Sequence, residues 1–504
     1  MRDLGAKNGH QHVVIIGAGP AGLTAAYELL KHDITTTVLE KDPTYVGGLA
    51  RTVEHKGYRF DIGGHRFFSK NQEVEDLWTE ILGSEMLTRG RLSRIYYRGR
   101  YFAYPIKAAN ALWNLGPIEA VRCIASYAYA RVRPVRNPRS LEDWVRNQFG
   151  WRLYSIFFKT YTEKVWGIST KELSADWAAQ RIKSLDMWLV LKSALLPRRR
   201  PKNRGDLVTT LIDRFRYPRF GPGQMWERVA EIHREKGRPV LMGRAVDRIK
   251  HDSGRVTSVV AKTADGDTEE HKGSEFISSM PIRELVSRLD PAPPEHVRKA
   301  ADSLSYRDFI SVAVMIDRAD VFPDNWIYIH DPTVKVGRIQ NFKNWSPDMV
   351  PDQSKTCLGL EYFCFEGDGL WTATDDELVD RARKELAQLG ICRPEEIFDG
   401  VVVRQRKAYP VYDDVYQAKV DVVRDYMREH LTNLHLAGRN GMHKYNNQDH
   451  SMMTALLVAR NIAKVGDFDQ WNVNADAVYH EEVRVGEKDL SGRQVPERLA
   501  GSAR

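Results

Sequence analysis

Cysteine and long hydrophobic runs are both scarce in this chain of 504 residues. The four cysteines, Cys123, Cys357, Cys364 and Cys392, form no Cys-x-x-Cys pair and are too few for a secreted disulfide scaffold. We expect them to be reduced core residues. No run approaches the roughly 18 uninterrupted apolar residues that span a bilayer. The start, MRDLGAKNGHQH, lacks an apolar signal segment. We therefore expect a cytoplasmic protein without a transmembrane segment.

Negative charge is in deficit, which leaves a formal net charge of +8. Such a balance suits nucleic acid, an acidic membrane surface or a phosphorylated small molecule. The basic residues are spread along the chain, and no zinc-finger, basic-zipper or RNP motif accompanies them, so we expect no nucleic-acid partner. The 42% hydrophobic and 28% charged fractions are typical of a globular enzyme. The length suits two or three interwoven domains, and we expect no metal site.

A β-α-β unit follows the polar start of the chain. The apolar run HVVII at residues 12–16 predicts a strand, Ala21 to Leu30 a helix, and Thr35 to Leu39 a second strand. Glu40 follows the second strand directly, where a carboxylate accepts from the hydroxyls of a bound ribose. This arrangement indicates a Rossmann-like nucleotide-binding domain.

The turn GAGPAG joins the first strand to the helix and has the G-x-G-x-x-G spacing. Gly17 permits the tight turn, Gly19 lets the backbone approach a pyrophosphate, and Gly22 lets helix and strand pack closely. The helix N-terminus then faces the anion. Strand, turn and helix in this order make the motif a strong predictor of a bound dinucleotide.

Two further glycine segments distinguish FAD from a nicotinamide cofactor. GGLARTV begins at Gly47 and FDIGGHRFF at Phe60. The first resembles the GG-x-x-R element of glutathione-reductase-like flavoproteins, including the amine oxidase and protoporphyrinogen oxidase group. The resemblance implies that Gly47, Gly48 and Arg51 contact the FAD diphosphate. The late segment AGRNG resembles the C-terminal flavin-binding turn of the same group and implies that Arg439 lies near the flavin.

The order of patterns predicts an α/β fold of three interleaved parts. These are a glutathione-reductase-like FAD-binding domain, an inserted helical domain and a β-sheet substrate domain. A Trp-, Tyr- and Arg-rich helical pattern follows Tyr104, strands alternate with one helix at Asp375 to Leu389, and a helix is expected from Ser451 to Val465. The predicted parts are FAD-binding residues 1–100, 205–300 and 425–504, the last including the tail, a helical substrate and lid domain 101–204, and a β-sheet domain 301–424.

Within this superfamily the chain resembles UDP-galactopyranose mutases, and the eukaryotic type more than the short bacterial type. The matching segments occur in order along most of the chain. They are YTEKVWGISTKELSADWAAQRI from Tyr161, YPRFGPGQMWE from Tyr217, WIY…GRI, KAYPVY, and GRNGMHKYNNQDHSM from Gly438.

The resemblance implies a clamp for a nucleotide-sugar diphosphate. Two arginines offer fork-like donors to the dianion, and tyrosine hydroxyls add further donors. The implied catalytic residues are Arg181, Arg338, His65, Tyr328, Tyr409 and Tyr445. The implied substrate contacts are Tyr104, Lys107, Thr162, Trp166, Arg181, Tyr328, Arg338, Tyr409, Tyr445 and Asn447. Gly64, His65, Asn447, Gln448 and Asp449 join the glycines, Glu40, Arg51 and Arg439 as implied cofactor contacts.

The family reaction implied by the resemblance exchanges pyranose and furanose rings without net redox. N5 of reduced FAD attacks the anomeric carbon and expels the nucleoside diphosphate, so no protein nucleophile is required. NADPH, or a separate reductase, is the expected source of electrons. His65 matches a histidine close to the isoalloxazine, where it tunes the flavin or serves as a structural donor.

The substrate and the reaction class both retain alternatives. Lys107 and Thr162 stand where the family commonly uses amide side chains for the uracil, so GDP-sugars and TDP-sugars remain open beside UDP-galactose. The second hypothesis is a true oxidase or dehydrogenase of the amine oxidase or protoporphyrinogen oxidase type. A flavin-containing scaffold is the third, for which no motif argues. The expected pathway is polysaccharide, glycoconjugate or natural-product synthesis, and a homo-oligomer is possible.

Overall fold

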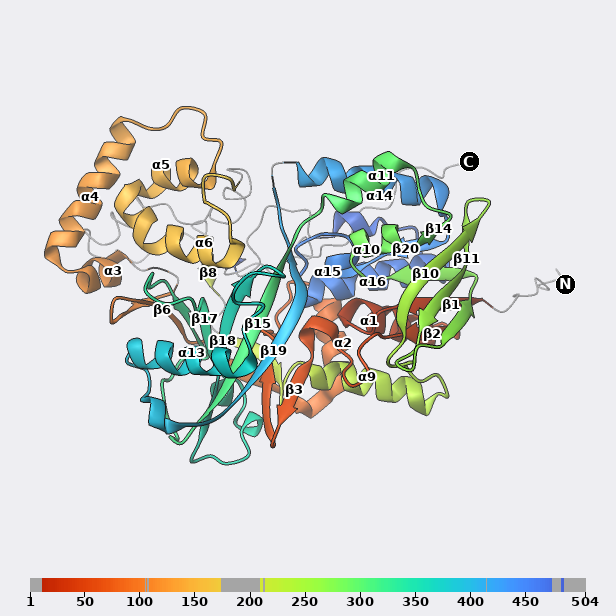
Figure 1. Ribbon diagram of the computed structural model, residues 1–504, viewed down its shortest axis with the longest axis horizontal. Helices are drawn as coiled ribbons and strands as arrows, with labels where there is room; N and C mark the ends of the chain where they lie inside the picture. Colours follow the sequence, from red (N-terminus) through yellow and green to blue (C-terminus); the bar gives the residue numbers. More distant parts are fainter. Residues whose placement is uncertain are drawn as a thin grey trace, which may run out of the picture.

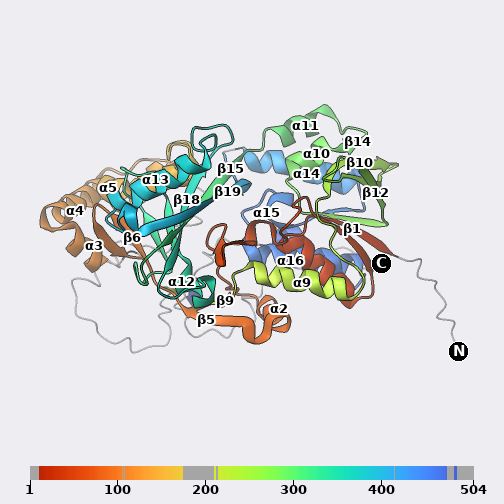
Figure 2. The ribbon, with the colours of Figure 1, turned by 60° about the horizontal axis from the view of Figure 1, so that its bottom comes forward.

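The computed structural model describes residues 11–104, 106, 108–173, 209–211, 214–413, 415–473 and 482–484. The described residues form two halves (Figure 1). One is the nucleotide-binding half, and the other carries the seven-stranded sheet and the helical region. The two halves lie side by side in both views (Figure 2).

A parallel four-stranded sheet forms the nucleotide-binding half, in the order β2-β1-β13-β20. Its elements are β1 (His12–Ile16), α1 (Pro20–Lys31), β2 (Thr35–Leu39), β13 (Glu275–Ser278) and β20 (Leu434–Leu436). Alternate residues of β1 enter two different cores, because successive side chains of a strand point to opposite faces. The predicted β-α-β unit and the α/β fold class are confirmed.

Helices and a second sheet cover the two faces. On the face of Val13 and Ile15, α1 packs against α16 (Gln448–Ile462), with α2 (Gln72–Leu82) and α9 (Gly223–Glu235) beside them. The face of Val14 and Ile16 meets a sheet in the order β12-β11-β10-β14. The elements on that side are β10 (Ala245–Asp252), β11 (Arg255–Lys262), β12 (Thr268–Lys272), β14 (Leu289–Asp290), α10 (Ile282–Ser287), α11 (Glu295–Asp302) and α14 (Tyr416–His430).

The larger sheet has seven strands in the order β19-β15-β18-β17-β16-β6-β7. They are β6 (Ser93–Tyr97), β7 (Arg100–Ala103), β15 (Tyr306–Ile316), β16 (Trp326–Ile329), β17 (Arg338–Asn341), β18 (Thr356–Cys364) and β19 (Ile397–Pro410). Every residue of the central β15 is buried, with alternate side chains in two cores. Helix α13 (Asp375–Gln388) covers one face, and the opposite face looks toward the nucleotide-binding half.

The helical region forms one end of the molecule (Figure 1). It contains α3 (Ala108–Leu115), α4 (Pro117–Val132), α5 (Leu141–Tyr154) and α6 (Thr160–Trp166). Helices α4 and α5 pack closely at Gly150, where a Cβ would lie 2.6 Å from the Tyr127 nitrogen. The remaining elements are β3 (Thr52–His55), β4 (Tyr58–Asp61), β5 (Met86–Gly90), β8 (Thr209–Leu211), β9 (Arg214–Pro218), α12 (Phe342–Trp345), α15 (Gly438–Gly441) and β21 (Glu482–Arg484).

Two boundaries differ from the sequence prediction. The last long helix begins at Gln448 and not at Ser451, because Asn447 stands at its N-cap and the polar first turn carries little apolar periodicity. The hairpin of β6 and β7 spans the predicted boundary at residue 100. Both strands belong to the larger sheet, because β6 pairs with β7 and with β16. None of the helices in the described ranges combines the length and apolar character needed to cross a bilayer.

Candidate functional site

Two glycine loops meet at the carboxyl end of β1 and form a cradle of main chain. Gly17 has a φ of 97°, and its N–H donates to the Leu39 carbonyl over 2.7 Å. A Cβ on Gly22 would lie 1.8 Å from the Gly17 carbonyl oxygen, so only glycine fits there. Across the cradle, a Cβ on Gly48 would lie 3.3 Å from the Gly19 Cα. Because both loops carry glycine at this approach, main chain and not side chains surrounds the N-terminus of α1.

Glu40 ties the first glycine loop to the segment that follows β2. Its carboxylate accepts from the Ala18 N–H at 2.7 Å and from the Asp42 N–H at 2.9 Å. Burial raises the pKa of Glu40 above its usual value, although both hydrogen bonds oppose the shift. Its remaining acceptor capacity suits a ribose hydroxyl.

Arg51 connects the cradle to the larger sheet. Its guanidinium donates to the Gly48 carbonyl at 2.9 Å and to the Gln405 Oε1 of β19 at 2.7 Å. Burial lowers the pKa of Arg51 from its usual value, which nevertheless leaves a cation beside the glycine loop. The sequence-predicted cofactor residues of the first fifty positions therefore lie in one place.

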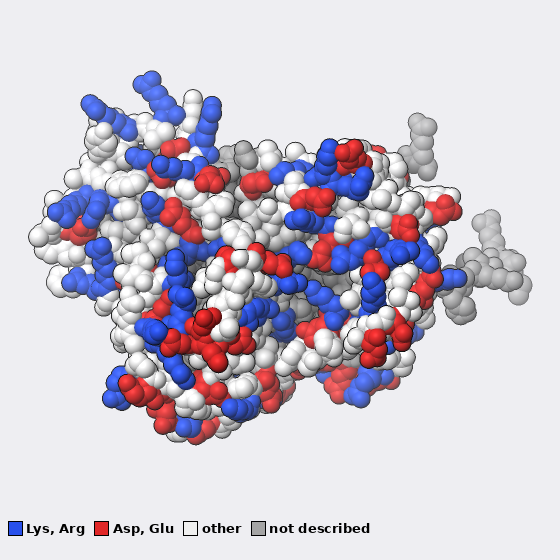
Figure 3. Space-filling model, viewed as in Figure 1, with Lys and Arg blue, Asp and Glu red and all other residues white. Residues whose placement is uncertain are grey.

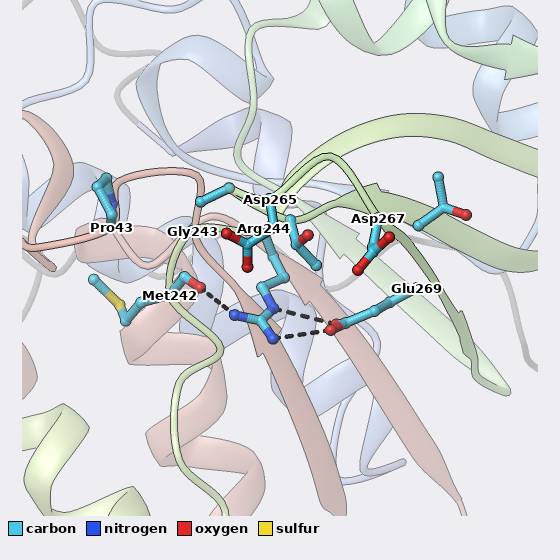
Figure 4. A pocket seen from close by; sticks show the side chains of 10 residues that line it. Pro43, Met242, Gly243, Arg244, Asp265, Asp267 and Glu269 are labelled. Carbon is cyan, nitrogen blue, oxygen red and sulfur yellow. Dashed lines mark hydrogen bonds and ion pairs between the residues drawn. The ribbon is translucent and has the colours of Figure 1, made fainter.

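A separate hollow of about 650 Å³ is lined by Pro43, Arg244 and Glu269, among others (Figure 4). It lies next to Glu40, whose carbonyl accepts from the Arg244 N–H at 2.7 Å. Arg244 crosses it and donates to both Glu269 oxygens, at 3.2 and 2.9 Å, and to the Met242 carbonyl at 2.9 Å. Its neighbour Gly243 donates to the Asp42 carbonyl at 3.1 Å. None of the sequence-predicted site residues lines this hollow, so we place the reaction elsewhere.

The Gly63–Gly64–His65 loop leads from the cradle toward the larger sheet. A Cβ on Gly63 would lie 3.9 Å from Arg338 Nη2, which places the loop beside β17. Burial and the nearby Arg439 and Arg338 cations lower the pKa of His65 to about 3. The imidazole is therefore neutral at any working pH.

Two of the sequence-predicted cofactor residues carry buried polar atoms without partners in the described part of the chain. His65 Nδ1 has no hydrogen-bond partner among the described residues, and neither does the side-chain oxygen or nitrogen of Gln448. Buried polar groups in folded proteins are almost always hydrogen-bonded, so these atoms are available to a polar ligand. Gln448 is the first residue of α16.

The other C-terminal residues of the predicted cofactor set are held by the protein. Arg439 donates to the Asn446 carbonyl at 2.8 Å and to the Ala408 carbonyl at 3.0 Å. Asp449 accepts from Ser69 Oγ at 3.0 Å, and the Asn447 N–H donates to His450 Nδ1 at 3.3 Å. The geometry gives Asn447 and Asp449 a role in fastening the start of α16 next to Gln448.

Arg338 of β17 is fixed by a buried ion pair. Its Nε donates to Glu361 Oε2 at 2.6 Å, and Gln340 donates to the other Glu361 oxygen at 2.7 Å. Burial by itself lowers the pKa of Arg338, but the Glu361 carboxylate and nearby tyrosines outweigh it and raise the pKa well above its usual value. The 18% exposed side chain stays charged and has one edge of its guanidinium held by Glu361.

Aromatic rings surround this arginine. Tyr328 lies opposite Arg338 in the β16–β17 register, and its ring centroid is 4.8 Å from that of Tyr104. The Tyr409 and Tyr445 rings stack at 5.7 Å, and Trp166 lies 6.2 Å from Tyr445. Four sequence segments that the resemblance implied thus converge around one guanidinium.

Tyr161 and Glu361 were not singled out from the sequence. The Tyr161 ring meets that of Tyr328 at 5.5 Å and stacks on His330 at 4.8 Å, and burial raises its pKa well above the usual value. Tyr161 stands at the start of the matched segment before Trp166, which was the available signal. Glu361 lies within the apolar strand CLGLEYFCF, where a lone acid between strand residues is the signal of a buried pair.

Of three further predicted substrate residues, the structure describes one. Thr162 is half-buried on α6, next to Tyr161. Arg181 and Lys107 lie outside the described residues.

Comparison with known proteins supplies the family. Residues 20–463 match the flavin containing amine oxidoreductases. The chain belongs to this family.

The relatives of this family member include sugar-nucleotide mutases. It is 29% identical over 173 residues to dTDP-fucopyranose mutase of Escherichia coli, which covers 32% of this chain and 44% of that protein. It is 24% identical over 177 residues to the probable UDP-galactopyranose mutase of Klebsiella pneumoniae, covering 33% and 44%. The chain thus matches less than half the length of these relatives. A structure of reduced UDP-galactopyranose mutase superposes with a TM-score of 0.77 at 22% identity, covering 90% of this chain and 94% of that one, which shows a shared fold.

The flavin of this family fits the residues present. The cradle offers main-chain N–H groups and a helix N-terminus to a diphosphate, as anions prefer. A flavin ring has nitrogen and oxygen atoms along one edge, and His65 and Gln448 present buried polar atoms that need such partners.

Proposed function

We propose that this chain is an FAD-dependent nucleotide-sugar mutase that interconverts pyranose and furanose rings without net redox. The observation that carries the proposal is the position of Arg338. This charged arginine, ringed by tyrosines, lies beside the glycine loop of His65. A fixed guanidinium there suits an anionic substrate such as a diphosphate better than a cationic amine or an apolar polyene.

Arg338, Glu361, Trp166, Tyr328, Tyr409 and Tyr445 form what we call the Arg338 cluster. This cluster suits a leaving group that must be held and then returned to the sugar. The Glu361 carboxylate holds Nε, while Nη2 faces the Gly63 loop. A guanidinium cannot lose its proton at neutral pH, so it neutralises a diphosphate without protonating it. Hydroxyls of Tyr328, Tyr409 and Tyr445 can donate to further phosphate oxygens, and we assign Arg181 as the second cation.

The protein otherwise provides position and dryness. Bound flavin, when reduced, supplies the nucleophile toward the anomeric carbon. The neutral His65 adds no competing positive charge, and its unpartnered Nδ1 can orient the ring edge. Trp166 and the stacked tyrosines exclude water from the sugar. We propose NAD(P)H as the reductant.

An amine oxidase is the second candidate, since the family carries that chemistry in its description. Parallel rings such as those of Tyr409 and Tyr445 can hold a cationic amine between them. However, the Arg439 guanidinium already lies 5.3 and 5.2 Å from the two ring centroids. A second cation at the same faces would be repelled, which favours an anionic substrate.

The test uses anaerobically reduced holoenzyme with a panel of UDP-, GDP- and dTDP-hexopyranoses and hexofuranoses. Ring form is followed by chromatography and NMR, with oxidised enzyme as control. We expect interconversion only with reduced flavin, and the panel identifies the base and sugar, including whether UDP-galactose is accepted. Hydrogen peroxide formed from an amine under air, with no ring exchange, would replace the mutase proposal with the oxidase.

A further inference from the structure

The outer face of helix α4 is apolar along its whole length. Its exposed residues recur every three or four positions, as one face of a helix requires. They are Ile118, Val121, Ile124, Ala125, Ala128, Tyr129 and Val132, and we call them the α4 stripe. At 3.6 residues per turn they span an arc of about 140°. Exposure reaches 71% for Ile118 and 79% for Val132.

The stripe is a second face and not a poorly packed core. Cys123 and Tyr127, on the other side of α4, are buried against the rest of the helical region. The close contact at Gly150 fastens that inner side to α5. Trp113, near the end of α3 and shortly before α4 in the chain, is 86% exposed. Single exposed apolar residues need no explanation, but a contiguous stripe does.

Positive charge accompanies the stripe. Residues 117–139 contain five arginines, Arg122, Arg131, Arg133, Arg136 and Arg139, and one acid, Glu119. All five arginines are exposed, whereas Glu119 is only partly exposed and pairs with Arg152 and with Arg122. In the space-filling view, Lys and Arg side chains protrude from this end of the molecule (Figure 3).

We propose that the α4 stripe docks on the surface of a membrane rich in anionic lipids. An apolar helix face with tryptophan nearby and arginines at its borders matches the chemistry of a bilayer interface, where acyl chains meet anionic headgroups. A second copy of this chain is the weaker occupant. It would bring two surfaces of the same net positive charge together, with no acidic patch in residues 117–139 to offset them.

The experiment measures flotation of the full flavin-loaded chain with lipid vesicles. We expect binding to vesicles of phosphatidylcholine and phosphatidylglycerol, weaker binding to phosphatidylcholine alone, and release by high salt. Ile118→Ser/Val121→Ser/Val132→Ser should weaken binding by about tenfold or more, because it removes exposed apolar area that the membrane would bury. The control Val422→Ser/Val465→Ser changes exposed valines elsewhere and should bind as the parent does.

A charge variant separates the electrostatic part. Arg131→Gln/Arg133→Gln/Arg136→Gln should abolish the preference for anionic vesicles, whereas Arg234→Gln/Lys384→Gln/Arg428→Gln removes three exposed cations elsewhere and should retain it. Flavin content and circular dichroism verify folding. Equal vesicle binding by the parent and the stripe variant, or none by either, would overturn the proposal. So would a dimer in sedimentation that only the stripe variant loses, since a second copy would then cover the face.

Discussion

The cofactor cradle and the Arg338 cluster, for both of which we propose a phosphate ligand, are built in opposite ways. The cradle presents main chain, and glycines at 17, 19, 22 and 48 clear the space. The Arg338 cluster presents side chains from α6, β16, β17 and β19 and from the loop before α16. A permanently bound cofactor is served by a rigid, contiguous loop. A substrate that must leave is served by side chains brought together from distant segments.

Breaking the cradle should have the largest effect. Gly22→Ala puts a Cβ 1.8 Å from the Gly17 carbonyl, so the turn must distort and we expect protein without flavin. Gly19→Ala meets only the Gly48 Cα, at 3.9 Å, and should fold but bind flavin more weakly by on the order of tenfold. Flavin absorbance per protein measures both.

The control for this pair is Gly369→Ala, because no atom lies within 4 Å of its added Cβ. It should retain the parent's flavin content. Equal flavin content in Gly22→Ala and the parent would contradict the cradle.

Breaking the Arg338 cluster should leave the flavin in place. Arg338→Lys retains a cation but loses the fork that meets Glu361 and the diphosphate, so kcat/KM for the sugar nucleotide should fall on the order of 10²-fold. Thermal stabilisation by UDP, GDP or dTDP should weaken in parallel. Glu361→Gln tests positioning, since it leaves Arg338 charged but less firmly held.

The control for the arginine is Arg94→Lys, which alters another ion pair, with Asp324, on the same sheet. It should retain nucleotide binding. Loss of flavin in Arg338→Lys would show that Arg338 also supports cofactor binding. Unchanged thermal stabilisation by nucleotide would show that Arg338 does not bind the diphosphate.

The smallest expected effect is on stability. It concerns the β3–β4 hairpin, which lies in the chain between the glycine loop of the cradle and the Gly63 loop beside Arg338. Asp61 of β4 accepts from Tyr217 at 2.5 Å and from Thr52 at 3.2 Å, and burial raises its pKa to about 8. In the unfolded chain the carboxyl ionises near pH 4, so between about pH 4 and 8 the folded state binds the extra proton. Stability from this group therefore falls as pH rises through that window, by at most about 1.4 kcal/mol per pH unit.

Asp61→Asn cannot ionise and should flatten this dependence. Urea unfolding at several pH values between 4 and 8 measures the slope for the two proteins. We expect the variant to gain stability relative to the parent as pH rises. A parallel pH dependence in both would show that Asp61 is ionised in the folded state.

Part of the candidate site was readable from the sequence because its residues are local. A strand, a G-x-G-x-x-G turn and a helix within thirty residues predict their own geometry, and the structure has β1, α1 and β2 at those positions. The fold class and the flavin-containing family followed from such segments. The tyrosines and Arg338 were named through resemblance, and their roles stay predictions, as do those of Arg181 and Lys107.

The amino-acid sequence by itself determined the nucleotide-binding unit and the family, since contiguous motifs need only local backbone geometry. Tertiary structure alone decided that Glu361 holds Arg338 and that Tyr161 meets Tyr328, because these contacts join strands and helices far apart in the chain. It also decided which face of α4 is exposed. Periodicity marks an apolar face, but only packing against α5 shows which side remains uncovered.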